Sequence, residues 1–222
     1  MQETHSQQLI TQLRTRLLVM CAATRIAFET ATQALTEGNS AKAQSVVDGD
    51  RSIDMLEDEI DAMALSILIR TQPMASDLRF VVGALRMVID LERIGDESAT
   101  IAGRMRLSPG ELWMIMARAN EKMVSFAQKL LLEALAAFQE QNAEAALTLC
   151  QLNDEVTQEE MAIFESICHM APAPSGANAA IPSVLVYRSL SRICHRAFNL
   201  AEETYFIVTG ESIKHRKISA AE

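Results

Sequence analysis

The chain has 222 residues, with 29 Asp and Glu against 20 Lys and Arg, which gives a formal net charge of -9 at pH 7. Because neutralisation of phosphates by Lys and Arg supplies most nucleic-acid affinity, this charge argues against a nucleic-acid-binding protein. Only 8 glycines and 5 prolines accompany abundant Ala, Leu, Met and Glu. This composition excludes collagen-like and β-sandwich chains and favours helices.

Turn-forming residues divide the chain into six long segments with helical periodicity. In the second segment Ile53, Ile60 and Ile67 recur at helical spacing, and in the third Val81, Val88 and their neighbours Leu85 and Ile89 do the same. Ser108 before Pro109 predicts a cap and first-turn proline for the fourth helix. The six predicted helices cover about 5–36, 40–70, 75–106, 110–140, 143–170 and 181–209.

The expected compartment is the cytoplasm. The first residues are polar, which predicts no signal peptide, and no apolar run approaches the roughly 18 residues of a membrane span. The four cysteines form no CxxC pair, so reduced thiols are the simplest interpretation.

The six segments indicate an internal repeat of about 100 residues. Glu37 and Asn39 match Glu140 and Asn142, in the same order along the chain. Further on, four residues around Arg93 match four around Arg192: Leu91, Arg93, Ile94 and Ala102 correspond to Leu190, Arg192, Ile193 and Ala201. We therefore expect an all-α fold of two tandem antiparallel three-helix bundles, with domains at 1–107 and 108–222.

Acidic pairs carry the strongest chemical signal. Asp50 and Asp54 are four residues apart in the second segment, as are Glu92 and Asp96 in the third, so each pair lies on one helical face. Asp54 and Glu92 are equidistant from the break at Pro73, as are Asp50 and Asp96. In an antiparallel hairpin the four carboxylates therefore meet at one level. Such groups repel one another unless a cation neutralises them, and all-oxygen ligands suit Mg²⁺, Ca²⁺, Mn²⁺ or iron.

An alternative interpretation needs no metal. Arg79, Arg86 and Arg93 recur along the third segment and could pair with the acids of the second segment, including Glu57, Asp58, Glu59 and Asp61. Acidic pairs at this spacing are also common on solvated helix faces. The residues alone leave both interpretations open.

The second half of the repeat lacks these acids. Asn153, Thr157, Ser191 and His195 occupy the positions that match Asp50, Asp54, Glu92 and Asp96. Their joint loss indicates that the four acids act as one site and that the second bundle does not carry it. His195 with Cys194 and His169 could form a softer metal site, or His195 is an ordinary polar residue on a helix.

The chain resembles the PhoU family of phosphate-signalling proteins. The resemblance rests on residues 70–79 (RTQPMASDLR) and 90–96 (DLERIGD), with weaker similarity at 199–203 (NLAEE) and 208–211 (VTGE). It implies two similar three-helix bundles in a non-enzymatic, cytoplasmic regulator. This regulator connects the ATPase of the phosphate ABC transporter to a sensor histidine kinase. The resemblance also implies clusters of iron or another divalent cation, such as manganese or magnesium, with no organic cofactor, at motifs corresponding to Asp50, Asp54, Glu92 and Asp96.

Two further functions compete with an adaptor. A carboxylate-bridged metalloenzyme would use Glu-x-x-His on inward-facing helices, and the sequence has no such motif. A helical transcription factor is disfavoured by the net charge, since the only basic cluster is the short run at 214–217. The chain is at most peripheral to a membrane, and a homodimer is the expected assembly because isologous dimers are the commonest.

Overall fold

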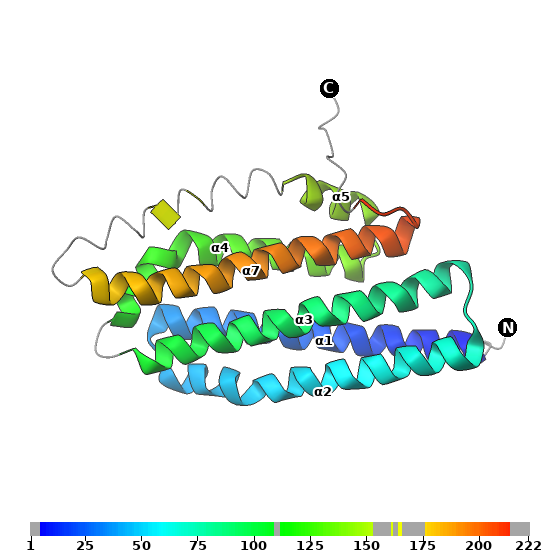
Figure 1. Cartoon of the computed structure of the whole chain (residues 1–222), viewed down its shortest axis with the longest axis horizontal. Coiled ribbons are helices and arrows are strands. Elements are labelled where there is room, and N and C mark those ends of the chain that lie inside the picture. The colour runs from blue at the N-terminus through cyan, green and yellow to red at the C-terminus, as the bar shows by residue number, and fades with distance from the viewer. Residues whose placement is uncertain (1–4, 109–111, 153–160, 162–163, 166–175, 214–222) are drawn as a thin grey trace, which may run out of the picture.

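The computed structural model describes residues 5–108, 112–152, 161, 164–165 and 176–213, and every regular element in this part of the chain is an α-helix. The predicted all-α fold is confirmed (Figure 1). The helices are α1 (His5–Glu37), α2 (Ser40–Thr71), α3 (Ala75–Leu107), α4 (Leu112–Gln139), α5 (Ala143–Gln151) and α7 (Gly176–Thr209).

The helices form two bundles in tandem. In the first, α1, α2 and α3 pack against one another; in the second, α4 packs against α5 and α7. The bundles meet where α3 lies along α7 and α1 lies along α4 (Figure 1). One continuous apolar core runs through both, from Leu17 of α1 through Leu91 of α3 to Leu130 and Leu190. Within the described residues, no helix combines the length and apolarity needed to cross a bilayer.

The start of α7 differs from the sequence-based expectation, and Ser108 has a role at the end of α3. Ser108 ends α3: its hydroxyl donates to the Arg104 carbonyl at 2.7 Å and its backbone N–H donates to the Met105 carbonyl at 3.1 Å. It therefore caps the preceding helix, and residues 109–111 lie outside the described part. Helix α7 begins at Gly176, so Pro182 lies inside it. Near a helix start, the missing N–H of proline removes a single backbone hydrogen bond.

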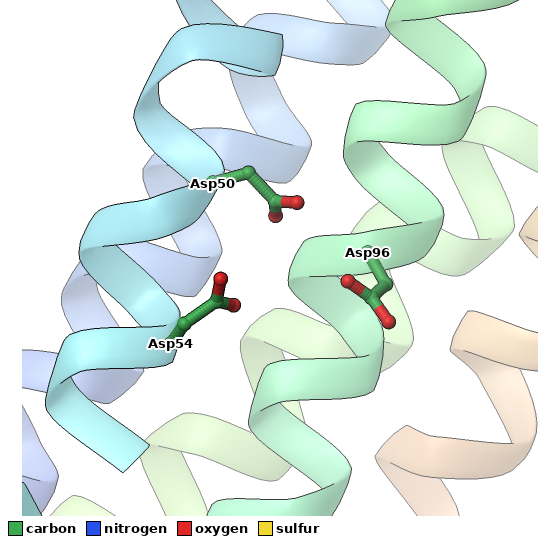
Figure 2. A group of neighbouring side chains, drawn as sticks. All are labelled: Asp50, Asp54 and Asp96. Atoms are coloured by element: carbon green, nitrogen blue, oxygen red, sulfur yellow. The ribbon is translucent and has the colours of Figure 1, made fainter. Parts of the chain in front are cut away.

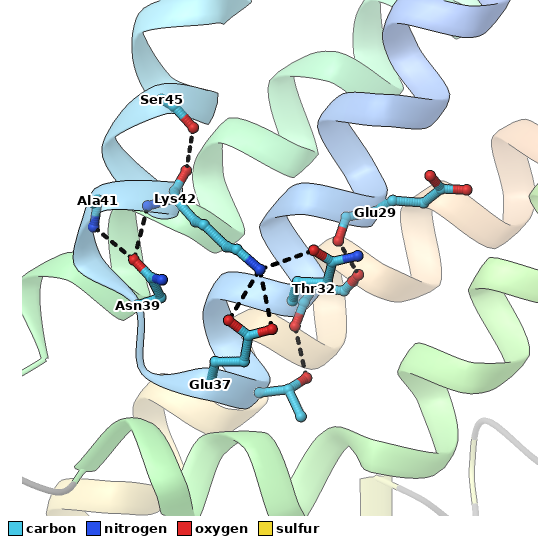
Figure 3. A network of polar contacts seen from close by, with 9 residues as sticks. Glu29, Thr32, Glu37, Asn39, Ala41, Lys42 and Ser45 are labelled. Atoms are coloured by element: carbon cyan, nitrogen blue, oxygen red, sulfur yellow. Dashed lines mark hydrogen bonds and ion pairs between the residues drawn. The ribbon is translucent and has the colours of Figure 1, made fainter.

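The repeated asparagines build the same turn twice. Asn39 begins α2 and Asn142 begins α5 with nearly identical backbone angles, φ -91 ψ 96 and φ -92 ψ 95. The Asn39 side-chain oxygen accepts from the N–H groups of Ala41 and Lys42, both at 3.1 Å (Figure 3). Such caps satisfy helix N–H groups that have no partner in the helix. The residue match in the sequence thus reflects a repeated helix start.

Asn39→Ala is expected to lower the free energy of unfolding by about 1 kcal/mol, because two N–H groups of α2 lose their acceptor. Urea unfolding measures the change. Asn39→Ser keeps an oxygen acceptor and should retain most of the stability. Equal losses in both variants would contradict the capping role.

Three ion pairs join the two bundles along α3 and α7. Arg192 donates to Glu97 at 2.6 Å, Arg196 to Asp90 at 2.9 Å, and Arg86 to Glu203 at 3.2 Å. Asp90 also accepts from the Asn199 amide at 3.1 Å. The pairs follow one another in opposite order along the two helices, which run antiparallel (Figure 1). The three pairs form together only when α3 and α7 are aligned in this one register, so they fix how the two bundles are aligned along these helices.

Candidate metal site on the α2–α3 hairpin

Three of the four predicted acidic residues converge. Asp50 and Asp54 lie one turn apart on α2 and point toward α3, which carries Asp96 (Figure 2). One carboxylate oxygen of each residue lies within 4.8 Å of the other two. Asp50 is partly buried, whereas Asp54 and Asp96 are exposed. The hairpin therefore presents three carboxylates at one point of its surface.

A glycine allows the two helices to approach at this level. A Cβ atom on Gly95 would lie 2.9 Å from Ile53 Cδ1 and 3.5 Å from Asp50 Oδ1. Ile53 is buried beneath the carboxylates and packs where that Cβ would be. A larger residue at position 95 would displace Ile53, so Gly95 and Ile53 together set the distance between α2 and α3 at the site.

Glu92 lies beside this group of three and is not part of it. Burial, followed by the charges of Asp96 and Glu57, raises the pKa of Glu92 from 4.5 to about 7. A hydrogen bond with Asp96 acts in the same direction, and the positive charge of Arg93 opposes them. Glu92 therefore extends the acidic site one turn along α3, on the side of Asp96 that is closer to the hairpin turn.

The site predicted from the sequence did not include Glu57. Burial and the charges of Asp61, Asp58, Asp54 and Asp96 raise its pKa. Glu57 follows Asp54 by three residues, and this spacing places both on one face of α2. This spacing is visible in the sequence and could have been used to predict Glu57 as part of the site.

The carboxylates fit a hard cation. Burial and the charges of Asp96 and Asp54 raise the pKa of Asp50, as expected for like charges held together. Oxygen ligands bind Ca²⁺ at about 2.3–2.6 Å, so oxygens on opposite sides of one ion are about 5 Å apart. The 4.8 Å limit on the three carboxylate oxygens is within this range. Asp50, Asp54 and Asp96 could therefore hold one cation.

The interpretation based on arginine pairing receives no support from the described ion pairs. Arg86 pairs with Glu203 of α7, and its guanidinium carbon lies 5.3 Å from the Phe206 ring centroid. Among the acids of α2, Glu59 pairs with Arg16 of α1. Within the described parts of α2 and α3, no ion pair joins Arg79, Arg86 or Arg93 to an acid of α2.

The matching positions of the second half are only partly described. Ser191 is partly buried and His195 is exposed on α7, whereas Asn153 and Thr157 lie outside the described residues. Of the softer alternative site, Cys194 is fully buried and His169 lies outside the described residues.

The apolar residues that recur along the third predicted helix do not all face the core. Val81 and Val88 are buried, but Ile89 is 46% exposed, and Asp96 is exposed as well. Ile89 and Asp96 therefore lie on the outer face of α3, whereas Leu85 packs against the core. A tightly packed three-helix bundle buries one stripe per helix, and the apolar run of α3 is wider than that stripe.

The stability of the metal-free chain is expected to fall as the pH rises from 4.5 to 7. In this window the folded chain keeps a proton on Glu92 that the unfolded chain releases, so protonation favours the folded state. Thermal unfolding in chelator should show a lower Tm at pH 8 than at pH 5, and Glu92→Gln should reduce this difference. An unchanged pH profile in the Glu92→Gln variant would contradict the assignment.

The fold and the acidic hairpin define a class of all-α proteins built from two tandem helical bundles. The family model described as PhoU domain matches residues 17–105 and 121–204, once in each bundle. The chain belongs to the PhoU family.

Relatives with known names cover nearly the whole chain. A protein of Pseudomonas aeruginosa, named phosphate-specific transport system accessory protein PhoU homolog, is 34% identical over 91% of this chain and 85% of its own length. A Thermotoga maritima protein, named PhoU homolog 1 of the same system, is 29% identical over 95% and 91%. The crystal structure of PhoU from P. aeruginosa superposes with a TM-score of 0.82 at 32% identity and covers 92% of this chain and 99% of that chain.

Proposed function

We propose that this protein is a cytoplasmic regulator of phosphate uptake and of the phosphate-starvation response, and that it acts as a non-enzymatic adaptor. Membership of the PhoU family is the observation that carries the proposal. The names of the relatives support it, since they describe accessory proteins of a phosphate-specific transport system. In this role the protein connects the ATPase of a phosphate ABC transporter with a sensor histidine kinase, and it acts as a homodimer.

The proposal includes a cation at the α2–α3 hairpin. Asp50, Asp54 and Asp96 would hold it, with Glu92 beside them. A divalent cation such as iron, manganese or magnesium would neutralise the repulsion among these carboxylates. Since the cation would hold two helices of one bundle together, it would also stabilise the face that they present.

A complementation experiment tests the adaptor. In a strain from which the gene is deleted, phosphate should no longer repress a starvation-induced reporter, and this protein should restore repression. An unrelated helical bundle of similar size serves as the control. Restoration by the control, or none by this protein, would contradict the adaptor.

Elemental analysis tests the cation separately. A D50A/D54A/E92A/D96A variant should retain far less manganese or iron than the parent after loading and desalting, because it lacks the clustered oxygen ligands. The matched control replaces four acids elsewhere with alanine and changes the net charge equally: Glu29, Glu121, Glu133 and Glu144. Equal metal content in the parent and the D50A/D54A/E92A/D96A variant would remove the cation and leave the adaptor intact.

A further inference from the structure

The outer face of the α2–α3 hairpin is divided into an acidic half and an apolar half. On each helix the acidic residues lie farther from the hairpin turn than the apolar ones. The acidic half consists of Asp50, Asp54, Glu57, Asp61, Glu92 and Asp96. The apolar half consists of five exposed side chains, which lie nearer the turn than the acids of the same helix: Leu65, Ile69, Met74, Leu78 and Ile89. We call the two halves together the divided face.

Helical spacing places both halves on one continuous face. On α3, residues 78, 89 and 96 are separated by three and two turns of helix, so their side chains point the same way. On α2, residues 54, 61 and 65 are related by the same periodicity. The close approach of Ile53 and Gly95 holds the two helices side by side along this face.

The apolar half is unusually exposed. Ile69 is 77% exposed, Leu65 54%, Ile89 46% and Leu78 41%. Single exposed apolar residues are common on protein surfaces, but a contiguous row rimmed by charge marks an interaction site. Among the described helices, α2 packs against α1 and α3, and α3 itself carries part of this row. In the described structure nothing therefore covers this row.

We infer that the divided face binds an amphipathic helix of a partner protein, with basic side chains at one end and apolar side chains at the other. The inference rests on the proposed adaptor function and specifies the chemistry of one partner contact. Lys or Arg side chains would meet the acidic half, and Leu or Ile side chains would cover the apolar half. The distance from residue 78 to 96 along α3 is about 27 Å, which matches a partner helix of about 18 residues.

Charge complementarity argues against the other occupants of this face. A second copy related by a two-fold axis would set acid against acid in the acidic half when the two faces run parallel, and acid against apolar side chains when they run antiparallel. An anionic membrane attracts basic protein segments, so it would repel the acidic half of the face. A basic helix with an apolar end satisfies both halves at once.

Binding of a synthetic probe tests the inference. The probe is a labelled 18-residue helical peptide whose first half is rich in Lys and whose second half is rich in Leu. A second peptide of equal composition alternates the two residue types along its length. In chelator, fluorescence anisotropy should show tighter binding of the divided peptide to the full chain. Equal binding of the two peptides would overturn the inference.

Matched variants locate the binding. Leu65→Ser with Ile89→Ser should weaken binding of the divided peptide at least about tenfold, since two apolar contacts are lost. The control pair, Ile26→Ser with Leu132→Ser, changes side chains that are 55% and 54% exposed on α1 and α4 and should leave binding unchanged. An equal loss in both pairs would overturn the inference.

Asp54→Asn with Asp96→Asn should also weaken binding and reduce its dependence on salt, because the variant removes two charges from the acidic half. A salt dependence equal to that of the parent would contradict the role of these charges. Manganese should compete with the peptide if it occupies the same carboxylates.

Two further arms distinguish the alternatives. The chain should not bind vesicles of phosphatidylglycerol, and Leu65→Ser with Ile89→Ser should not change its oligomeric state. Binding of the vesicles would overturn the inference in favour of a membrane. A changed oligomeric state would overturn it in favour of a second copy. Complementation separates this inference from the adaptor. Full repression by a chain that does not distinguish the two peptides would overturn the docking face alone. Discrimination between the peptides without repression would contradict the adaptor and support the face.

Discussion

Gly38→Ala is expected to lower the free energy of unfolding by about 3 kcal/mol. Residue 38 joins α1 to α2 with φ +66, a left-handed conformation that costs about 1–2 kcal/mol for a residue with a Cβ atom. A Cβ atom there would also lie 2.5 Å from the Trp113 ring of α4. Because an aromatic ring is rigid, overpacking adds about 1–3 kcal/mol. The substitution would disturb the turn and the contact between the bundles together.

Urea unfolding and intrinsic fluorescence measure this result. Trp113 is the only tryptophan in the chain, so its emission reports directly on the contact with the α1–α2 turn. Gly49→Ala is the matched control, since a Cβ atom there has no neighbour within 4 Å, and it should stabilise α2 by up to about 1 kcal/mol. A Gly38→Ala chain with the stability and emission of the parent would show that this turn does not constrain the bundles.

Asp90→Ala is expected to lower the free energy of unfolding by about 2 kcal/mol. Asp90 is 7% exposed, and it accepts from Arg196 at 2.9 Å and from Asn199 at 3.1 Å. Hydrogen bonds to a charged group are worth about 1.5–3 kcal/mol, and their loss leaves a partly buried guanidinium without this acceptor. Arg196 is half-buried, and the water that reaches it keeps the loss toward the lower end of that range.

A double-mutant cycle with Arg196→Ala isolates the pair, and the coupling energy should be a substantial part of the loss. Glu29→Ala is the control because its partner Arg25 lies one turn away on the exposed surface of α1; it should change stability by at most about 0.5 kcal/mol. Equal effects of Asp90→Ala and Glu29→Ala would contradict a structural role for the α3–α7 ion pairs.

Sequence reasoning located the helices of the first bundle closely. The first three predicted segments end within one residue of α1, α2 and α3, because turn residues and helix caps act locally. From the sequence, Asn39 and Asn142 could be recognised only as identical residues at matching positions of the repeat. Its physical reason, a side-chain cap at the start of α2 and of α5, required the backbone geometry.

The candidate site was predicted in outline but not in register. Equal distances from Pro73 paired Asp54 with Glu92, whereas the structure brings Asp96 to both Asp50 and Asp54 and sets Glu92 near Glu57. The turn is asymmetric: Gln72 is left-handed and Met74 is extended. Counting residues from the break could not include this asymmetry.

The amino-acid sequence was enough to establish that this chain is helical, duplicated and acidic on one hairpin. Caps and helical periodicity depend on neighbouring positions, and the duplication shows as residues that match about 100 positions apart. The tertiary structure alone decided which apolar residues remain exposed, as with Ile89, and which charges join the bundles, as with Asp90 and Arg196. These depend on the angle and register at which distant helices pack, and no single segment encodes either.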